Sequence, residues 1–211
     1  INDNDQDEII KWIKDAKKAA DWVLVSIHCH EDPPGGYSFN GENTPEFLRE
    51  FSKSVVDAGA DIVAGHGPHV MRGMELYNNK PIFYSLGNFI FQNDTIKWHP
   101  HPTYESVGLD HYATPSDFYD KRYDGDTKGF PALQDYWESI VAECKLSKEG
   151  VKEINLFPIE LGYKLPRSQR GRPVIARQDN KERIIDKLAQ LSKPFGTKIE
   201  FTENGLGRVN I

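Results

Sequence analysis

The stretch that decides the fold is Asp61-Ile-Val-Ala-Gly-His-Gly-Pro-His69, in which an apolar run stops at a glycine and two histidines follow. Such a run predicts a buried strand that opens into a loop. Loops after buried strands carry much of the chemistry of α/β proteins. Two imidazoles on a loop stiffened by Pro68 can point at a common centre. Neutral imidazole is a common ligand of zinc, iron, copper and nickel, so the stretch predicts a candidate metal site at a strand end.

A similar arrangement occurs earlier in the chain. The apolar spacing of residues 7–20 predicts a helix, with acidic residues at its start and lysines at its end. Residues 21–28 are β-branched and nearly uncharged, which predicts a strand covered on both faces. This strand ends in the polar stretch His28-Cys-His-Glu-Asp32, where His28 and His30 share a face if the strand persists that far.

A second helix leads into the deciding stretch. Thr44 is the expected N-cap, Pro45 suits the first helical position, and Gly59 is the expected C-cap. Helix, strand and loop thus occur twice, at 7–32 and 44–69, which is the pattern of α/β layers. If the two strands are neighbours in one sheet, both histidine clusters fall on the same edge.

The rest of the chain is less periodic. We expect a long surface insertion at 92–135 that can serve as a lid, and a solvated basic loop from Arg167 to Arg172. Further elements are expected as two short strands joined by an Asn-Asn-Lys turn within 75–84, a hairpin within 139–161, an amphipathic helix at 179–192 and a last strand within 195–211.

Composition excludes several classes of protein. The 211 residues are 38% hydrophobic and 27% charged, as in a globular chain, and the net charge of −6 argues against a nucleic-acid partner. No apolar run is long enough for a transmembrane segment. Cys29 and Cys144 form no motif, and a disulfide between them stays open. The first residues are acidic and lack an initiator Met, from which we expect a piece of a longer protein.

Several motifs together resemble the CapA family, which is named for the synthesis of capsule and poly-γ-glutamate. The motifs are Val25-Ser-Ile-His28, Asp57-Ala-Gly-Ala-Asp61, Gly65-His-Gly-Pro-His-Val70, Gly73-Met-Glu75 and Pro81-Ile-Phe-Tyr-Ser-Leu-Gly-Asn-Phe89. This family looks like a branch of the calcineurin-like metallophosphoesterases. The resemblance implies their α/β fold for this chain, a two-sheet β-sandwich flanked by helices.

The resemblance also implies a metal centre. In that superfamily an isolated histidine and a Gly-His-x-His loop help to hold two metal ions. The matching residues here are His28, His66 and His69, and the implied cofactors are two divalent ions, such as Mn, Zn or Fe. The loop reads His-x-x-His, a spacing that CapA-like sequences share. The early Asp and Asn motifs of the superfamily are absent, so residues 1–211 resemble the C-terminal part of one domain that is incomplete at its N-terminus.

Other residues near these motifs are candidates for the remaining roles. His30 and Glu31 are candidate catalytic residues that would orient a ligand or relay a proton. Arg72, Glu75 and Asn88 are candidates for substrate binding. Each has a simpler interpretation: a solvated strand end for the first two, a surface ion pair for Arg72 and Glu75, and a turn for the stretch that contains Asn88.

The function implied by the resemblance is metal-assisted hydrolysis in the synthesis of capsule or poly-γ-glutamate. Its substrate would be an anionic small molecule or polymer, cleaved at a phosphoester or a γ-glutamyl amide. The alternative is a non-catalytic scaffold that binds an anionic polymer or a partner during capsule export. The resemblance suggests a place outside the cytoplasm, at the cell surface or in the periplasm, and it leaves the oligomeric state open.

Overall fold

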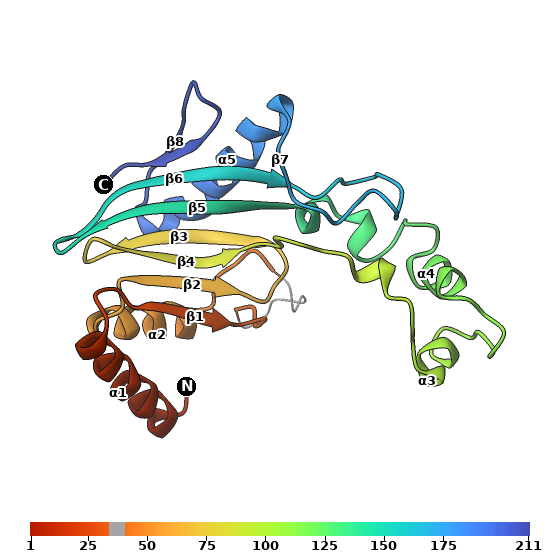
Figure 1. Ribbon diagram of the computed structural model, residues 1–211, viewed down its shortest axis with the longest axis horizontal. Helices are drawn as coiled ribbons and strands as arrows, with labels where there is room; N and C mark the ends of the chain where they lie inside the picture. The colour runs from red at the N-terminus through yellow and green to blue at the C-terminus, as the bar shows by residue number, and fades with distance from the viewer. Residues whose placement is uncertain (34–40) are drawn as a thin grey trace.

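The computed structural model describes residues 1–33 and 41–211, which form two β-sheets with helices on their faces (Figure 1). Sheet A has four strands in the order β1-β2-β4-β3, and sheet B has the path β5-β6-β9-β8 with β7 paired to β6. This confirms the α/β class and the two-sheet arrangement flanked by helices. Figure 1 shows α3 and α4 projecting from the end of the sheets at which β1 and β2 finish.

The elements of the first half build sheet A and its helical cover. They are α1 (Asp3–Ala19), β1 (Leu24–His28), α2 (Glu46–Asp57), β2 (Ile62–His66), β3 (Met71–Tyr77) and β4 (Lys80–Leu86). The elements of the insertion are η1 (Asn93–Thr95), α3 (His101–Glu105), α4 (Pro115–Tyr123), η2 (Phe130–Ala132) and η3 (Gln134–Trp137). The second half contributes β5 (Glu138–Ser147), β6 (Gly150–Glu160), β7 (Val174–Ile175), α5 (Gln178–Ser192), η4 (Lys193–Phe195), β8 (Ile199–Phe201) and β9 (Gly207–Val209).

The register of sheet A brings the two histidine clusters together. β1 runs parallel to β2, and His28 is the register partner of His66. β2 is parallel to β4, which pairs with β3 in an antiparallel hairpin. The hairpin turns at Asn78 and Asn79, whose φ values of +48° and +57° suit a type I′ turn. The expectation that both clusters share one edge of one sheet is confirmed.

Two apolar cores hold the layers. On one face of sheet A, α1 and α2 bury side chains against β2 and β4. Between sheet A, sheet B and α5 lies the second core, which includes Met74, Phe83, Ile154, Leu156 and Ile184, each at most 3% exposed. Full burial of a side chain of this size stabilises the fold by roughly 1.5–3 kcal/mol. The second core is what joins the two sheets.

A buried carboxylate ties α1 to sheet A. Asp61 is 2% exposed and accepts hydrogen bonds from Lys17 (2.6 Å), from Lys80 and from the backbone N–H of Val23 (2.9 Å). Burial alone would raise the pKa of Asp61. The bonds from the two lysines more than offset that effect, so the pKa lies below its ordinary value.

Several local expectations need correction. α1 begins at Asp3 rather than residue 7, because the side chain of Asn2 caps it. Pro45, not Thr44, holds the N-cap position of α2, and no side chain caps that helix. The final segment forms two short strands, β8 and β9, instead of one. Both cysteines are free thiols.

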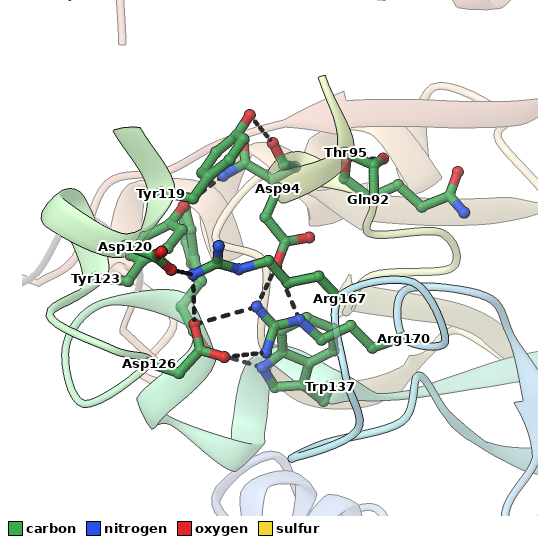
Figure 2. A network of polar contacts seen from close by, with 12 residues as sticks. Gln92, Asp94, Thr95, Tyr119, Asp120, Tyr123, Asp126, Trp137, Arg167 and Arg170 are labelled. Carbon is green, nitrogen blue, oxygen red and sulfur yellow. Dashed lines mark hydrogen bonds and ion pairs between the residues drawn. The ribbon is translucent and has the colours of Figure 1, made fainter. Parts of the chain in front are cut away.

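The basic loop from Arg167 to Arg172 is only partly solvated, which corrects the prediction for Arg170 while Arg172 is exposed as expected. Arg170 is 3% exposed and donates to Asp94 (2.8 Å from Nε) and Asp126 (2.7 Å from Nη1), as Figure 2 shows. Its guanidinium also lies 5.2 Å from the centre of the Trp137 ring. The two aspartates come from the insertion, so Arg170 fastens that insertion to the end of sheet B.

Candidate metal centre

The loop after β2 is held close to the end of β1. Gly67 has φ of +127°, and a Cβ on it would lie 2.8 Å from the carbonyl oxygen of Cys29, so only glycine fits there. The backbone N–H of Cys29 in turn donates to the carbonyl oxygen of His66 at 2.8 Å. This close approach places His69 beside the residues that follow β1.

Four imidazoles form a continuous row at this edge. The ring centres of His66 and His28 are 4.9 Å apart, those of His28 and His30 are 4.8 Å apart, and those of His30 and His69 are 5.6 Å apart. The structure therefore brings the three predicted metal ligands together with one of the two predicted catalytic residues. Strand β1 ends at His28, so His30 joins the row from the loop and not from the strand.

His66 sits at the more polar end of the row. Its Nε2 lies 2.9 Å from the hydroxyl of Ser26, and its Nδ1 lies 3.0 Å from Nδ1 of His28. Burial lowers the pKa of His66, and the neighbouring His28 lowers it further. A histidine with a lowered pKa is neutral near pH 7 and keeps a ring lone pair for a ligand or a proton.

The ring of His69 is surrounded by Asn88 and two phenylalanines, and the phenylalanines were not predicted from the sequence. Its Nδ1 is 2.9 Å from Oδ1 of Asn88. The rings of Phe91 and Phe130 pack against the imidazole, each with its centre 5.6 Å away. Phe91 precedes the insertion and Phe130 lies near its end, where weak periodicity gave no signal that two phenylalanines would meet at a histidine.

Glu31, the other predicted catalytic residue, is exposed and bonds locally. The thiol of Cys29 donates to its Oε2 at 3.2 Å. That bond is the main cause that holds the pKa of Glu31 below its ordinary value, so the carboxylate is charged at neutral pH. Burial, with the neighbouring Glu31, raises the pKa of the Cys29 thiol.

Arg72 is fully buried, which excludes the surface ion pair expected as its simpler role. Its Nε donates to the carbonyl oxygen of Gly41 at 3.0 Å, and its Nη2 donates to that of Glu31 at 2.7 Å and to Oδ1 of Asp32 at 3.2 Å. Arg72 thus ties together both ends of the segment that follows β1. Its predicted substrate contact stays a prediction.

Glu75 is also buried, at 7% exposure, and does not pair with Arg72. It accepts a hydrogen bond from the hydroxyl of Tyr84 (2.7 Å) and forms an ion pair with Lys53 of α2 (2.9 Å). Since α2 covers the face of sheet A opposite to His66, the structure does not bring Glu75 to the histidine row.

The side chains at this edge supply only part of what the expected metal ions need as ligands. Imidazole nitrogen suits zinc and iron. Within residues 1–33 and 41–211, however, no three His, Cys, Asp or Glu side chains are arranged to hold an ion. Among the nearest carboxylates, Glu31 accepts from Cys29 and Asp32 from Arg72. The described residues therefore supply nitrogen donors of the right kind but not a complete centre.

An apolar groove of about 490 Å³ starts at His66 and runs between sheet A and β5. Leu24 and Phe89 line it and are 60% and 56% exposed. β1 is thus open on this face, which corrects the expectation that residues 21–28 are covered on both sides. In the described part of the chain β1 also pairs with β2 alone, so its other edge is open.

Among the helices of the described residues, none combines the length and the apolar character needed to cross a bilayer.

Comparison with known proteins gives one family match and several relatives. Residues 1–93, which contain every predicted site residue, match the family model described as "Bacterial capsule synthesis protein PGA_cap". The protein y4sH of Sinorhizobium fredii is 35% identical over 229 aligned residues, which cover all of this chain and 46% of y4sH. The chain therefore spans about half the length of that relative.

Two further relatives match only part of this chain. "PGA biosynthesis protein CapA" of Bacillus subtilis is 42% identical over 88 residues, or 41% of this chain and 21% of its own length. "Capsule biosynthesis protein CapA" of Bacillus anthracis is 45% identical over 80 residues, or 37% and 18%.

Proposed function

We propose that this chain, whose residues 1–93 match the model of bacterial capsule synthesis proteins and which is similar in part to two CapA proteins, is part of a metal-dependent hydrolase acting in the synthesis of capsule or poly-γ-glutamate. The substrate class is an anionic phosphoester or γ-glutamyl amide. The observation that carries this proposal is the row of four imidazoles at one sheet edge, inside the segment that matches the family. A solvated loop has no need to gather histidines in this way.

The metal ligands in this proposal are His28, His66 and His69. Bound divalent ions would generate hydroxide near neutral pH and stabilise charge developing on a phosphoryl or acyl group. The lowered pKa of His66 supports its role, because only a deprotonated imidazole nitrogen can bind a metal. His30 stands between His28 and His69 in the row, where it can take or give a proton.

We also propose that residues 1–211 are the C-terminal part of one metallophosphoesterase-like domain, and that another segment of the same protein fills the groove beside His66. Sheets of parallel strands are found almost only with both faces covered. The groove leaves one face of β1 and β2 open, and y4sH has about twice the length of this chain. A segment in that groove would lie next to the histidine row and can bring the carboxylate ligands that the row lacks.

Metal content of the complete gene product tests this function. We expect about two divalent ions per domain, as in two-metal hydrolases, and hydrolysis of a phosphodiester or γ-glutamyl substrate that a chelator abolishes. Residues 1–211 alone should show weak activity or none. Robust hydrolysis by residues 1–211 in the presence of a chelator would contradict the proposal.

The alternative is a non-catalytic scaffold that binds an anionic polymer or a partner in capsule export. It is favoured by one observation, the absence of a three-ligand group among the described residues. Absence of metal in the complete gene product, together with retained binding of poly-γ-glutamate, would select the scaffold.

A further inference from the structure

The amide of Asn88 contacts His69 at two places. Asn88 is 8% exposed and follows the end of β4. Its Nδ2 donates to the backbone carbonyl oxygen of His69 at 3.0 Å and to that of Tyr136 at 2.9 Å. Its other amide atom lies 2.9 Å from Nδ1 of the His69 ring.

These contacts fix which way round the amide lies. A carbonyl oxygen only accepts hydrogen bonds, so the atom facing the carbonyl oxygens of His69 and Tyr136 has to be the NH₂ group. The atom facing the His69 ring is then Oδ1, which also only accepts. The hydrogen of that contact must therefore come from the ring, so Nδ1 of His69 carries the proton.

We propose that Asn88 is a positioning residue that holds neutral His69 in the Nδ1–H tautomer and leaves Nε2 as its free ring nitrogen. A metal-binding histidine commonly donates its other ring N–H to such a partner, which fixes the ring and raises its basicity. That Nε2 binds a metal rests on the proposed function. The proton on Nδ1 follows from the contacts of Asn88 alone.

The backbone conformation of His69 is also stabilised by Asn88. Its φ is +64°, a left-handed value that is uncommon for a residue with a side chain. The bond from Nδ2 of Asn88 to the His69 carbonyl oxygen holds this conformation, while Phe91 and Phe130 pack against the ring. The side-chain amide of Asn88 thus fixes both the backbone conformation of His69 and the orientation of its imidazole ring.

This role differs from the substrate contact that the sequence predicts for Asn88. Both N–H groups of its amide already donate to backbone carbonyls. None is left to donate to an anionic substrate, which would need donors.

The tautomer can be measured by NMR on the complete gene product with ¹⁵N-labelled histidines. Long-range ¹H–¹⁵N correlations distinguish Nδ1–H from Nε2–H, and His69→Gln identifies the signals of His69 by their loss. We expect the Nδ1–H pattern for His69 in the wild type. An Nε2–H pattern in the metal-free wild type would overturn the proposal.

Two variants of Asn88 separate positioning from a general structural role. In Asn88→Ala the Nδ1–H pattern should be lost or averaged, whereas Asn88→Gln keeps both the amide oxygen and the NH₂ group and should retain it. An unchanged tautomer in a folded Asn88→Ala would also overturn the proposal. If that variant fails to fold, the wild-type pattern and Asn88→Gln decide. The control is Asn155→Ala, whose amide bonds Glu143 and Glu153 on sheet B and should leave His69 unchanged.

Failure of this inference can be told from failure of the proposed function. An Nδ1–H pattern for His69 in a protein that takes up no Zn²⁺ or Mn²⁺ would reject the metal centre and leave the tautomer assignment standing. Uptake of metal by a protein whose His69 is Nε2–H in the metal-free state would reject the role of Asn88 alone.

Discussion

The Nδ1 atoms of His28 and His66 lie 3.0 Å apart, although the two residues are 38 positions apart in the chain. Only one of these nitrogens can donate in that contact, so one ring presents a proton and the other a lone pair. The pair is a direct result of the parallel register, in which His28 and His66 face each other as the last residues of their strands. An ion that binds both rings through these Nδ1 atoms has to displace the hydrogen between them.

The first prediction concerns this pair. Replacing His66 with Ala in the complete gene product should lower metal affinity by about tenfold or more, since loss even of a group that supports a ligand has such an effect. The melting temperature of the metal-free protein should change little, because His66 is exposed. Metal content and calorimetry measure both. His101→Ala, an exposed histidine on α3, is the control, and equal metal loss in the two variants would reject the assignment.

The second prediction concerns the buried arginine of Figure 2. Arg170→Met should destabilise the protein by roughly 3–5 kcal/mol, because removing one partner of a buried ion pair leaves the buried carboxylate of Asp94 without its cation. Urea unfolding provides the measurement. Exposed Arg172→Met should cost about 0.5 kcal/mol or less. Equal unfolding midpoints for the two variants would show that the network does not hold the insertion.

The third prediction is a pH dependence that arises from Asp61. Its pKa is lower in the folded protein than the ordinary value of 3.8. A carboxylate with a lowered pKa adds stability that is fully present above the unfolded pKa and is lost as the pH falls through the folded pKa. Asp61→Asn should therefore cost more stability at about pH 7 than at about pH 3. Urea unfolding at both values tests this, and an equal cost at the two would contradict it.

The fourth prediction uses Cys144, which lines the groove beside His66. Burial raises the pKa of its thiol to about 11, so alkylation by iodoacetamide near pH 8 should be about 100-fold slower than for a free cysteine of pKa near 8.5. Cys29→Ser isolates this signal. If another segment fills the groove, Cys144 should react more slowly still in the complete gene product than in folded residues 1–211. Equal rates would argue against that covering.

Sequence reasoning succeeded where the signal was local or followed from strand register. The helix and strand patterns before His66 gave the α/β units, and parallel pairing then required both histidine clusters to share an edge. It failed for Arg170, because its partner Asp94 lies 76 positions away. The prediction that the strand containing Leu24 is covered on both faces was also wrong, since an apolar sequence does not reveal whether another element packs on each face. A surface ion pair was the simpler alternative to substrate binding for Arg72 and Glu75, and it is wrong because charge alone does not reveal the buried partners that a fold can supply.

Phe91 and Phe130 meet on the ring of His69, and their own ring centres are only 4.9 Å apart. The long insertion therefore leaves the body of the protein and returns to it at almost the same point. As long as Asp94 and Asp126 remain to pair with Arg170, we expect that the length and sequence of the remainder of this segment can vary without moving the backbone around the histidines. Two aromatic rings and one buried arginine thus separate the shape of the insertion from the geometry of the histidine row.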